Sequence, residues 1–134
     1  MSCILRISGT NLNLNEFSSS SLLPYSTWEK GKPKSDNKPD GKTNSSSGMR
    51  YLVSEADFDE FEIQKIDAIK YLKVNCKELE KLMSVRNIEE ACLDFAIERR
   101  DVVVQSDFFQ PELLRLSGEL GIGIMLSQYP IGND

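Results

Sequence analysis

Residues 31–48, GKPKSDNKPDGKTNSSSG, contain no hydrophobic side chain, and this stretch limits where a core can form. Gly, Pro, Ser, Asn and Lys bury too little apolar surface to offset the conformational entropy lost on ordering. The stretch is also longer than an ordinary connection between elements. We therefore predict a single domain over residues 1–134 with a flexible polar insertion at about 31–48.

Apolar residues on both sides of the insertion recur with the periods of strands and helices. We expect strands at 2–8, 25–30, 49–53, 90–98, 102–106 and 122–126, and helices at 13–22, at 59–73, from 75 onward and at 111–121. A turn at 99–101 is expected to join 90–98 and 102–106 as a hairpin. The buried stripe of the longest helix is predicted to contain Ile63, Ile66, Ile69 and Leu72.

This order of elements predicts an α+β fold, in which helices cover one face of a mostly antiparallel sheet. Both ends of the chain read as strand–helix–strand units, so a split ferredoxin-like arrangement is expected. Alternation along the strands then places one set of residues on the face opposite the helices: Ile4, Arg6, Asp94, Val103, Met125, Ser127 and Tyr129.

The chain has no histidine, which removes the commonest general base and metal ligand near neutral pH. Cys3, Cys76 and Cys92 include no CxxC pair and no imidazole can activate them, so we expect reduced thiols in a cytosolic protein. We predict no catalytic residue, no metal and no cofactor.

Acidic residues outnumber basic ones, 21 to 16, for a net charge of −5. This balance argues against general affinity for nucleic acid or an anionic membrane. The N-terminus lacks the charged start and apolar core of a signal peptide, and no later segment is apolar enough to span a bilayer. The expected location is cytoplasmic.

Carboxylates crowd the start of the longest helix: Glu55, Asp57, Asp59, Glu60 and Glu62. Backbone amides and the helix dipole favour such residues without any further purpose. The Asp57/Asp59 spacing resembles the opening of a calcium loop, but the glycine of its sharp turn is missing. A third interpretation is a docking patch that attracts a basic partner.

The open sheet face is the second candidate surface. Arg6 and Asp94 can pair across strands if their registers match, and Met125 and Tyr129 add side chains enriched in protein interfaces. The alternatives are a half-exposed face without a role, or one covered by the first helix or the insertion. Trp28, the only tryptophan, is either a buried plug beneath the insertion or a binding residue.

Three stretches together resemble a group of small, mostly bacterial proteins classed as domains of unknown function, some of them presumed immunity proteins of polymorphic toxin systems. The stretches are Leu23-Pro24-Tyr25-Ser26-Thr27-Trp28-Glu29-Lys30-Gly31, the helix Phe61 to Leu72, and Pro111 to Pro130 with its closing Ser127-Gln128-Tyr129-Pro130. The resemblance covers most of the chain outside 32–48. It implies an α+β fold and a protein-binding role, and no catalytic residue carries over.

The function expected from these observations is non-enzymatic protein binding, with an immunity protein that occludes a basic toxin as the favoured case. One alternative is a regulatory domain that binds a small molecule between sheet and loop. A carboxylate-dependent hydrolase is the other, and it requires two acidic side chains that converge in a cleft.

Overall fold

The computed structural model describes residues 2–35 and 37–130. Its elements, in chain order, are β1 (Cys3–Gly9), the 3-10 helix η1 (Leu14–Phe17), β2 (Ser26–Trp28), β3 (Ser47–Ser54), α1 (Phe61–Val74), α2 (Cys76–Met83), β4 (Glu90–Arg99), α3 (Pro111–Glu119) and β5 (Gly123–Pro130). None of the helices within these residues is long and apolar enough to cross a bilayer.

The five strands form one sheet in the order β2-β3-β1-β4-β5. The first three pairs in this order are antiparallel, and β4 pairs with β5 in parallel. The parallel pair is joined through α3, because parallel neighbours require a crossover connection. The fold is thus α+β with a mostly antiparallel sheet, as the sequence predicts.

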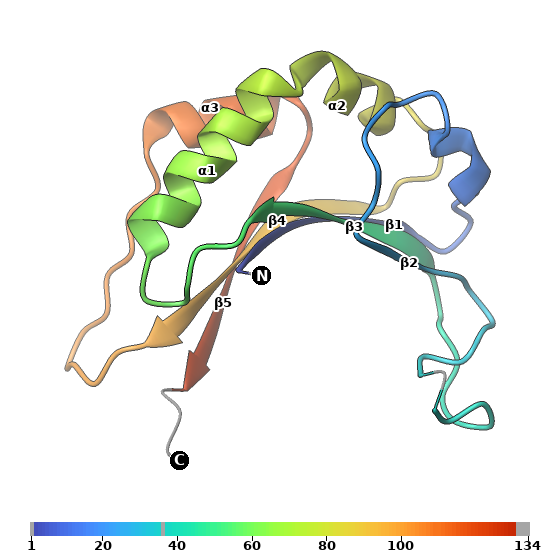
Figure 1. Cartoon of the computed structure of the whole chain (residues 1–134), viewed down its shortest axis with the longest axis horizontal. Coiled ribbons are helices and arrows are strands. Elements are labelled where there is room, and N and C mark those ends of the chain that lie inside the picture. The colour runs from blue at the N-terminus through green and yellow to red at the C-terminus, as the bar shows by residue number, and fades with distance from the viewer. Residues whose placement is uncertain (1, 36, 131–134) are drawn as a thin grey trace.

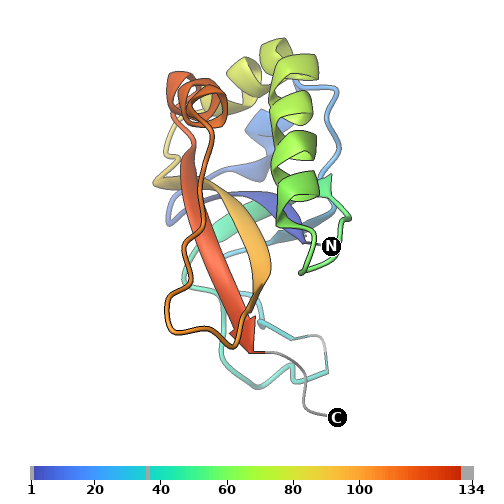
Figure 2. The same ribbon diagram turned by 90° about the vertical axis from the view of Figure 1, so that its left-hand side faces the viewer.

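The three α-helices lie on one face of the sheet and leave the other face uncovered (Figure 1). Alternation along β1 sends Cys3, Leu5 and Ile7 toward the helices, where all three are buried. Leu93 and Phe95 of β4 share that layer. The same view turned by 90° shows the helices stacked above the twisted sheet (Figure 2). This one-sided layering makes the opposite sheet face an accessible surface.

The second expected strand–helix–strand unit is present as β4, α3 and β5, and its two strands are adjacent and parallel. At the other end of the chain, β1 pairs antiparallel with β3 and is followed by a single 3-10 turn. The finer split ferredoxin-like arrangement stays a prediction.

The hairpin predicted for 90–98 and 102–106 is wrong. Residues 100–110 contain no strand and carry the chain from the end of β4 to α3. Val103, expected on the open sheet face, is fully exposed in this segment. On the side away from β1, β4 pairs with β5 over an unbroken register from Cys92↔Gly123 to Arg99↔Pro130. The expected hairpin turn has no Asn-Gly sequence that would favour the competing pairing.

The predicted stripe of α1 is also wrong in part. Ile63 and Ile66 are exposed, whereas Gln64, Lys65, Ala68 and Leu72 are buried. The buried face is rotated toward two polar side chains because both have hydrogen-bond partners there: the Gln64 amide donates to two backbone carbonyls, and Lys65 donates to a carboxylate and a carbonyl.

The polar insertion leaves the sheet as an extension of the β2–β3 hairpin. Backbone hydrogen bonds join Asn44 to Lys32 and Lys34 to Lys42, both 2.9 Å long, and an isolated bridge pairs Pro33 with Thr43. The loop projects beyond the sheet in Figure 1, at the end opposite the start of α1.

Candidate protein-binding site

A groove of about 560 Å³ lies between the start of α1 and the segment that follows β4. We call it the acidic groove, and the residues that line it are Asp59, Glu60, Phe61, Glu62, Ile63, Arg100, Ser106, Asp107 and Phe108. Four of these side chains are carboxylates and one is cationic. The groove therefore presents a negative potential in a concave surface, which concentrates field lines.

Local helix-start chemistry gathers the carboxylates. Glu60 is the N-cap of α1, and its Oε1 accepts a 2.9 Å hydrogen bond from the backbone N–H of Asp57. Ligand oxygens of Asp57, Asp59 and Glu60 lie within 4.8 Å of one another. Such oxygens can hold a hard cation, but the helix dipole alone also stabilises carboxylates at this position. The geometry by itself indicates a place where a positive charge is favoured.

Lys65 anchors the wall of the groove. Its side chain is only 1% exposed, and Nζ donates to Glu62 Oε1 at 2.9 Å and to the Phe108 carbonyl at 2.6 Å. The ammonium also lies 4.3 Å from the centroid of the Phe61 ring. Lys65 thereby ties α1 to the segment carrying Asp107 and Phe108.

Salt bridges neutralise part of the groove and leave the rest negative. Arg100 pairs with Asp107 at 3.2 Å, and Lys65 pairs with Glu62. Within residues 2–35 and 37–130, no Lys or Arg forms a salt bridge with Asp57, Asp59 or Glu60. These three carboxylates remain available to an incoming cation.

Exposed apolar side chains border the acidic groove. Phe108 is 68% exposed and Ile63 45% exposed, and both line it. Ile66 continues the apolar face of α1 one turn further along. A negative cavity with an apolar rim matches the usual anatomy of interface hot spots, in which a buried anchor is surrounded by contacts that exclude water.

Phe58 connects the acidic groove with the open sheet face. Its ring stacks on Tyr129 of β5, with centroids 5.4 Å apart and an interplanar angle of 16°. The Phe58 carbonyl also accepts a 3.1 Å hydrogen bond from the Glu98 amide of β4. The two surfaces expected from the sequence therefore meet at Tyr129.

On the open sheet face, Arg6 and Asp94 form a 3.0 Å salt bridge between β1 and β4. Ser127 donates a 2.6 Å hydrogen bond to the other Asp94 oxygen, and Arg6 also lies 3.3 Å from the Met125 sulfur. Partial burial lowers the pKa of Arg6, but Cys92 and Asp94 outweigh it and raise the pKa overall. At the centre of the open sheet face, the charges of Arg6 and Asp94 therefore neutralise each other within a network of polar contacts.

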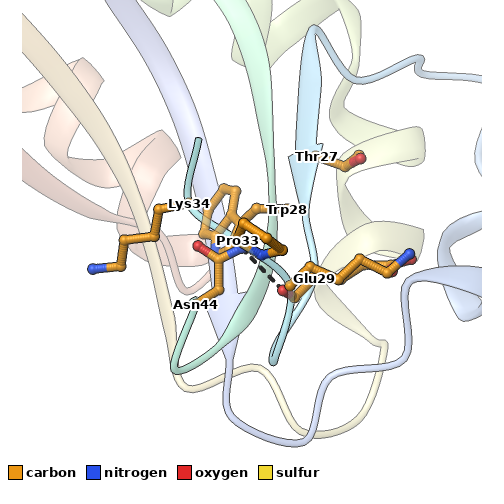
Figure 3. Close-up of a pocket in the computed structure, with 7 residues that line it drawn as sticks. Thr27, Trp28, Glu29, Pro33, Lys34 and Asn44 are labelled. Atoms are coloured by element: carbon orange, nitrogen blue, oxygen red, sulfur yellow. Dashed lines mark hydrogen bonds and ion pairs between the residues drawn. The ribbon is translucent and has the colours of Figure 1, made fainter. Parts of the chain in front are cut away.

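Trp28 lies on the same open face beside Arg50, whose guanidinium is 4.3 Å from the ring centroid. The indole N–H donates to Ser46 Oγ at 3.3 Å, and a pocket of about 390 Å³ opens between β2 and the insertion (Figure 3). Pro33, Lys34 and Asn44 line it together with Trp28. The tryptophan is half-buried. It therefore packs beneath the insertion, as a plug would, and also offers an accessible ring surface, as a binding residue would.

Cys3 and Cys92 are buried, and Cys76 is half-buried at the start of α2, outside the lining of the acidic groove. Burial raises the pKa of the Cys3 and Cys92 thiols, and partial desolvation followed by Glu80 raises that of Cys76. The thiolate, which is the reactive form, is disfavoured at each of the three positions.

The structure brings most of the candidate residues together in two groups. Asp59, Glu60 and Glu62 line the acidic groove, and Asp57 lies beside Asp59 and Glu60 just outside the lining. Glu55 is exposed and belongs neither to the lining nor to this cluster. Arg6, Asp94 and Met125 are in contact on the open face, with Tyr129 at its edge.

Sequence patterns did not indicate Arg100, Asp107 and Phe108 as site residues. Arg100 lies in the turn of the predicted hairpin, and Asp107 and Phe108 follow its second strand, so their approach to α1 depends on the crossover from β4 to α3. The Gln110-Pro111 pair marks only the start of α3. The crossover itself follows from the pairing of β4 with β5, which no local pattern of residues 100–110 indicates.

Comparison of the chain with protein-family models, with curated proteins and with solved structures gives no match.

Proposed function

We propose that this chain is a non-enzymatic protein-binding domain whose acidic groove receives basic side chains of a partner protein. The favoured partner is a basic toxin that the domain neutralises by occlusion, in keeping with the resemblance to presumed immunity proteins. Nucleic acid and membrane are not expected partners of a chain with net charge −5.

One observation carries the proposal: Asp59 and Glu60, which form no salt bridge within residues 2–35 and 37–130, line one concave surface together with exposed Phe108 and Ile63, and Asp57 lies beside these two carboxylates. A solvated helix start explains the carboxylates alone, but it does not explain why a large aromatic ring remains exposed beside them. Apolar contact and charge pairing in one place are what a protein anchor such as Arg or Lys uses.

Binding would proceed in two physical steps. The negative potential around Asp57 and Asp59 would steer a basic partner toward the groove and raise the association rate, an effect that salt screens. Phe108 and Ile63 would then pack against the aliphatic part of the entering side chain and exclude water. Occlusion of the partner's own active surface would follow from the area covered, on the order of 1,600 Å² for a standard interface.

The test begins with the protein encoded beside this chain, or a partner recovered by pull-down from the native host, followed by isothermal titration calorimetry. The double variant Asp59→Asn/Glu60→Gln removes two charges and keeps side-chain shape, including the acceptor of the Asp57 N–H. We expect its affinity to fall roughly tenfold or more, with a weaker dependence on salt.

The matched control is Asp40→Asn/Glu119→Gln, which removes the same charge at exposed positions outside the acidic groove. It should leave the affinity within roughly twofold of wild type. Equal losses in both variants would reduce the effect to net charge, and no loss in either would exclude the acidic groove as the binding surface.

The second candidate function is small-molecule binding in the pocket beside Trp28. Its supporting observation is the cavity of about 390 Å³ between sheet and insertion, lined by an aromatic ring, Lys34 and Asn44. A metabolite that raises the melting temperature and quenches the fluorescence of the only tryptophan, with no protein partner present, would favour this function.

A further inference from the structure

The strand β5 forms one edge of the sheet, and its outer side is open. It pairs only with β4, in a register that runs without interruption from Cys92↔Gly123 to Arg99↔Pro130. Among residues 2–35 and 37–130, no hydrogen bond satisfies the outer backbone groups of β5. Figure 2 shows this strand, in red, at the rim of the sheet. A row of free N–H and C=O groups is a template for another strand.

The two edges of the sheet differ in how they are protected. The other edge strand, β2, is three residues long and is followed by the charged pair Glu29-Lys30 and the lysine-rich insertion. By contrast, β5 has eight residues, and no charged residue occurs from Leu120 to Pro130. Soluble monomers normally blunt an edge with charge, shortness, a bulge or proline, and β5 has only the terminal Pro130.

We propose that β5 pairs antiparallel with β5 of a second copy of this chain, so that two sheets join into one across a two-fold axis. A two-fold interface must be complementary to itself, which requires that like charges do not face each other. An uncharged strand meets this condition. A basic partner has no carboxylate to pair with on β5, and the carboxylates lie at the acidic groove instead.

The side chains of β5 also match in this arrangement. With the two-fold axis at Ser127, Met125 of one copy lies opposite Tyr129 of the other, and this pair occurs twice on the open face. Met125 is 39% and Tyr129 47% exposed, so both have surface left to bury. Thioether sulfur against an aromatic ring is a favourable contact. Ser127, already held by Asp94, places a small residue at the axis.

Sedimentation equilibrium of the full chain tests the proposal, because it measures mass as a function of concentration. We expect the wild-type chain to form a dimer. For Gln128→Lys we expect a dissociation constant of the dimer roughly tenfold higher or more than that of wild type, because the two lysines, one from each copy, lie on either side of the axis and repel each other. Gln128 is exposed and forms none of the side-chain hydrogen bonds within the described residues, so the monomer should tolerate the change. The matched control, Thr27→Lys, adds the same charge at an exposed position of the other edge strand and should remain dimeric.

Hydrogen exchange on the wild-type chain supplies a second readout that needs no variant. Amides of β5 should exchange more slowly as the chain is concentrated, while those of β2 should not change. A wild type that stays monomeric at every concentration would overturn the proposal. It would equally be overturned by a dimer that persists in Gln128→Lys, or by one without added protection in β5. The acidic-groove variant Asp59→Asn/Glu60→Gln should remain dimeric, so the two proposals fail independently.

Discussion

At the scale of single residues, the open sheet face depends on a glycine. Gly48 lies opposite Trp28 in the β2–β3 ladder, and the indole ring lies directly over it. A Cβ added at Gly48 would stand 2.2 Å from Trp28 Cζ2 and 2.6 Å from the Ile7 carbonyl oxygen. Because one of these atoms is backbone, a rotamer change of the tryptophan cannot relieve the clash. Gly48 therefore sets the position of Trp28 and of Arg50 beside it.

We predict that Gly48→Ala lowers the free energy of unfolding by about 1–3 kcal/mol, since the strand and the ring must both shift. Urea unfolding followed by circular dichroism measures this, because the fluorescence of Trp28 would itself change.

The control Gly118→Ala reverses the expected sign. Gly118 lies in α3, a Cβ there meets nothing within 4 Å, and alanine favours a helix by up to about 1 kcal/mol. If both alanine variants were equally stable, close packing of Trp28 on Gly48 would not be present in solution.

At the scale of elements, α1 is attached to the segment that follows β4 by Lys65, a charged residue on the buried face of the helix that the periodicity of apolar residues does not predict. Lys65 donates to the Phe108 carbonyl, while its salt-bridge partner Glu62 is 75% exposed. Lys65 therefore contributes most of the stabilising free energy of these contacts. If Glu62 is lost, water can take its place, but water cannot reach the buried site to replace the Lys65 ammonium.

We predict that Lys65→Met lowers the free energy of unfolding by about 1–3 kcal/mol, since it leaves the Phe108 carbonyl without a donor. Glu62→Gln should cost less than about 1 kcal/mol. Chemical denaturation measures both, and hydrogen exchange of residues 100–110 should accelerate only in Lys65→Met. A neutral Lys65→Met would show that the segment is held by apolar packing instead.

The same helix shows how far sequence reasoning reaches. Its existence and length follow from local periodicity, but its rotation does not: Ile63 and Ile66 are exposed, and Gln64 and Lys65 are buried. Burial of those polar groups depends on the carbonyls of Ala96 and Phe108, which are remote in sequence, and on the Asp57 carbonyl in the loop before the helix. Patterns that count apolar residues cannot include such partners.

The candidate site likewise has one part that local sequence predicts and one part that only the tertiary structure determines. The carboxylate cluster is local, so the spacing of Asp57, Asp59 and Glu60 is sufficient to predict it. The opposite wall of the acidic groove comes from the crossover after β4, and its place next to α1 follows from the β4–β5 pairing. The sequence does not predict the parallel pairing of β4 with β5, because the three consecutive valines Val102–Val104 have high strand propensity and indicate a hairpin partner for β4 instead.

At the scale of the whole molecule, charge is segregated along the sheet. The acidic groove lies at the C-terminal ends of β4 and β5, whereas Lys32, Lys34, Lys38 and Lys42 belong to the insertion at the other end (Figure 1). A basic partner of the kind proposed would be oriented as well as attracted, because the insertion would repel it. On this proposal the insertion contributes to electrostatics without contributing to the stability of the fold.

Shortening the insertion tests that separation. The backbone hydrogen bond from the Asn44 N–H to the Lys32 carbonyl has the pattern that closes a two-residue hairpin loop, so Asn-Gly can replace residues 33–43 between them. A shorter loop costs less closure entropy, and few core contacts are lost. We predict a free energy of unfolding equal to wild type or up to about 1 kcal/mol higher, measured in urea.

The control is a chain of full length with residues 33–43 in scrambled order, which keeps the composition and the net charge of −5. Removal of three lysines and two aspartates in the shortened chain makes its net charge −6, so a basic partner should bind at least as tightly as before. If the pocket beside Trp28 were the functional site instead, loss of Pro33 and Lys34 from its lining would abolish binding in the shortened chain. Destabilisation by more than about 2 kcal/mol would mean that the insertion is part of the folded unit and that the two ends of the molecule cannot be treated separately.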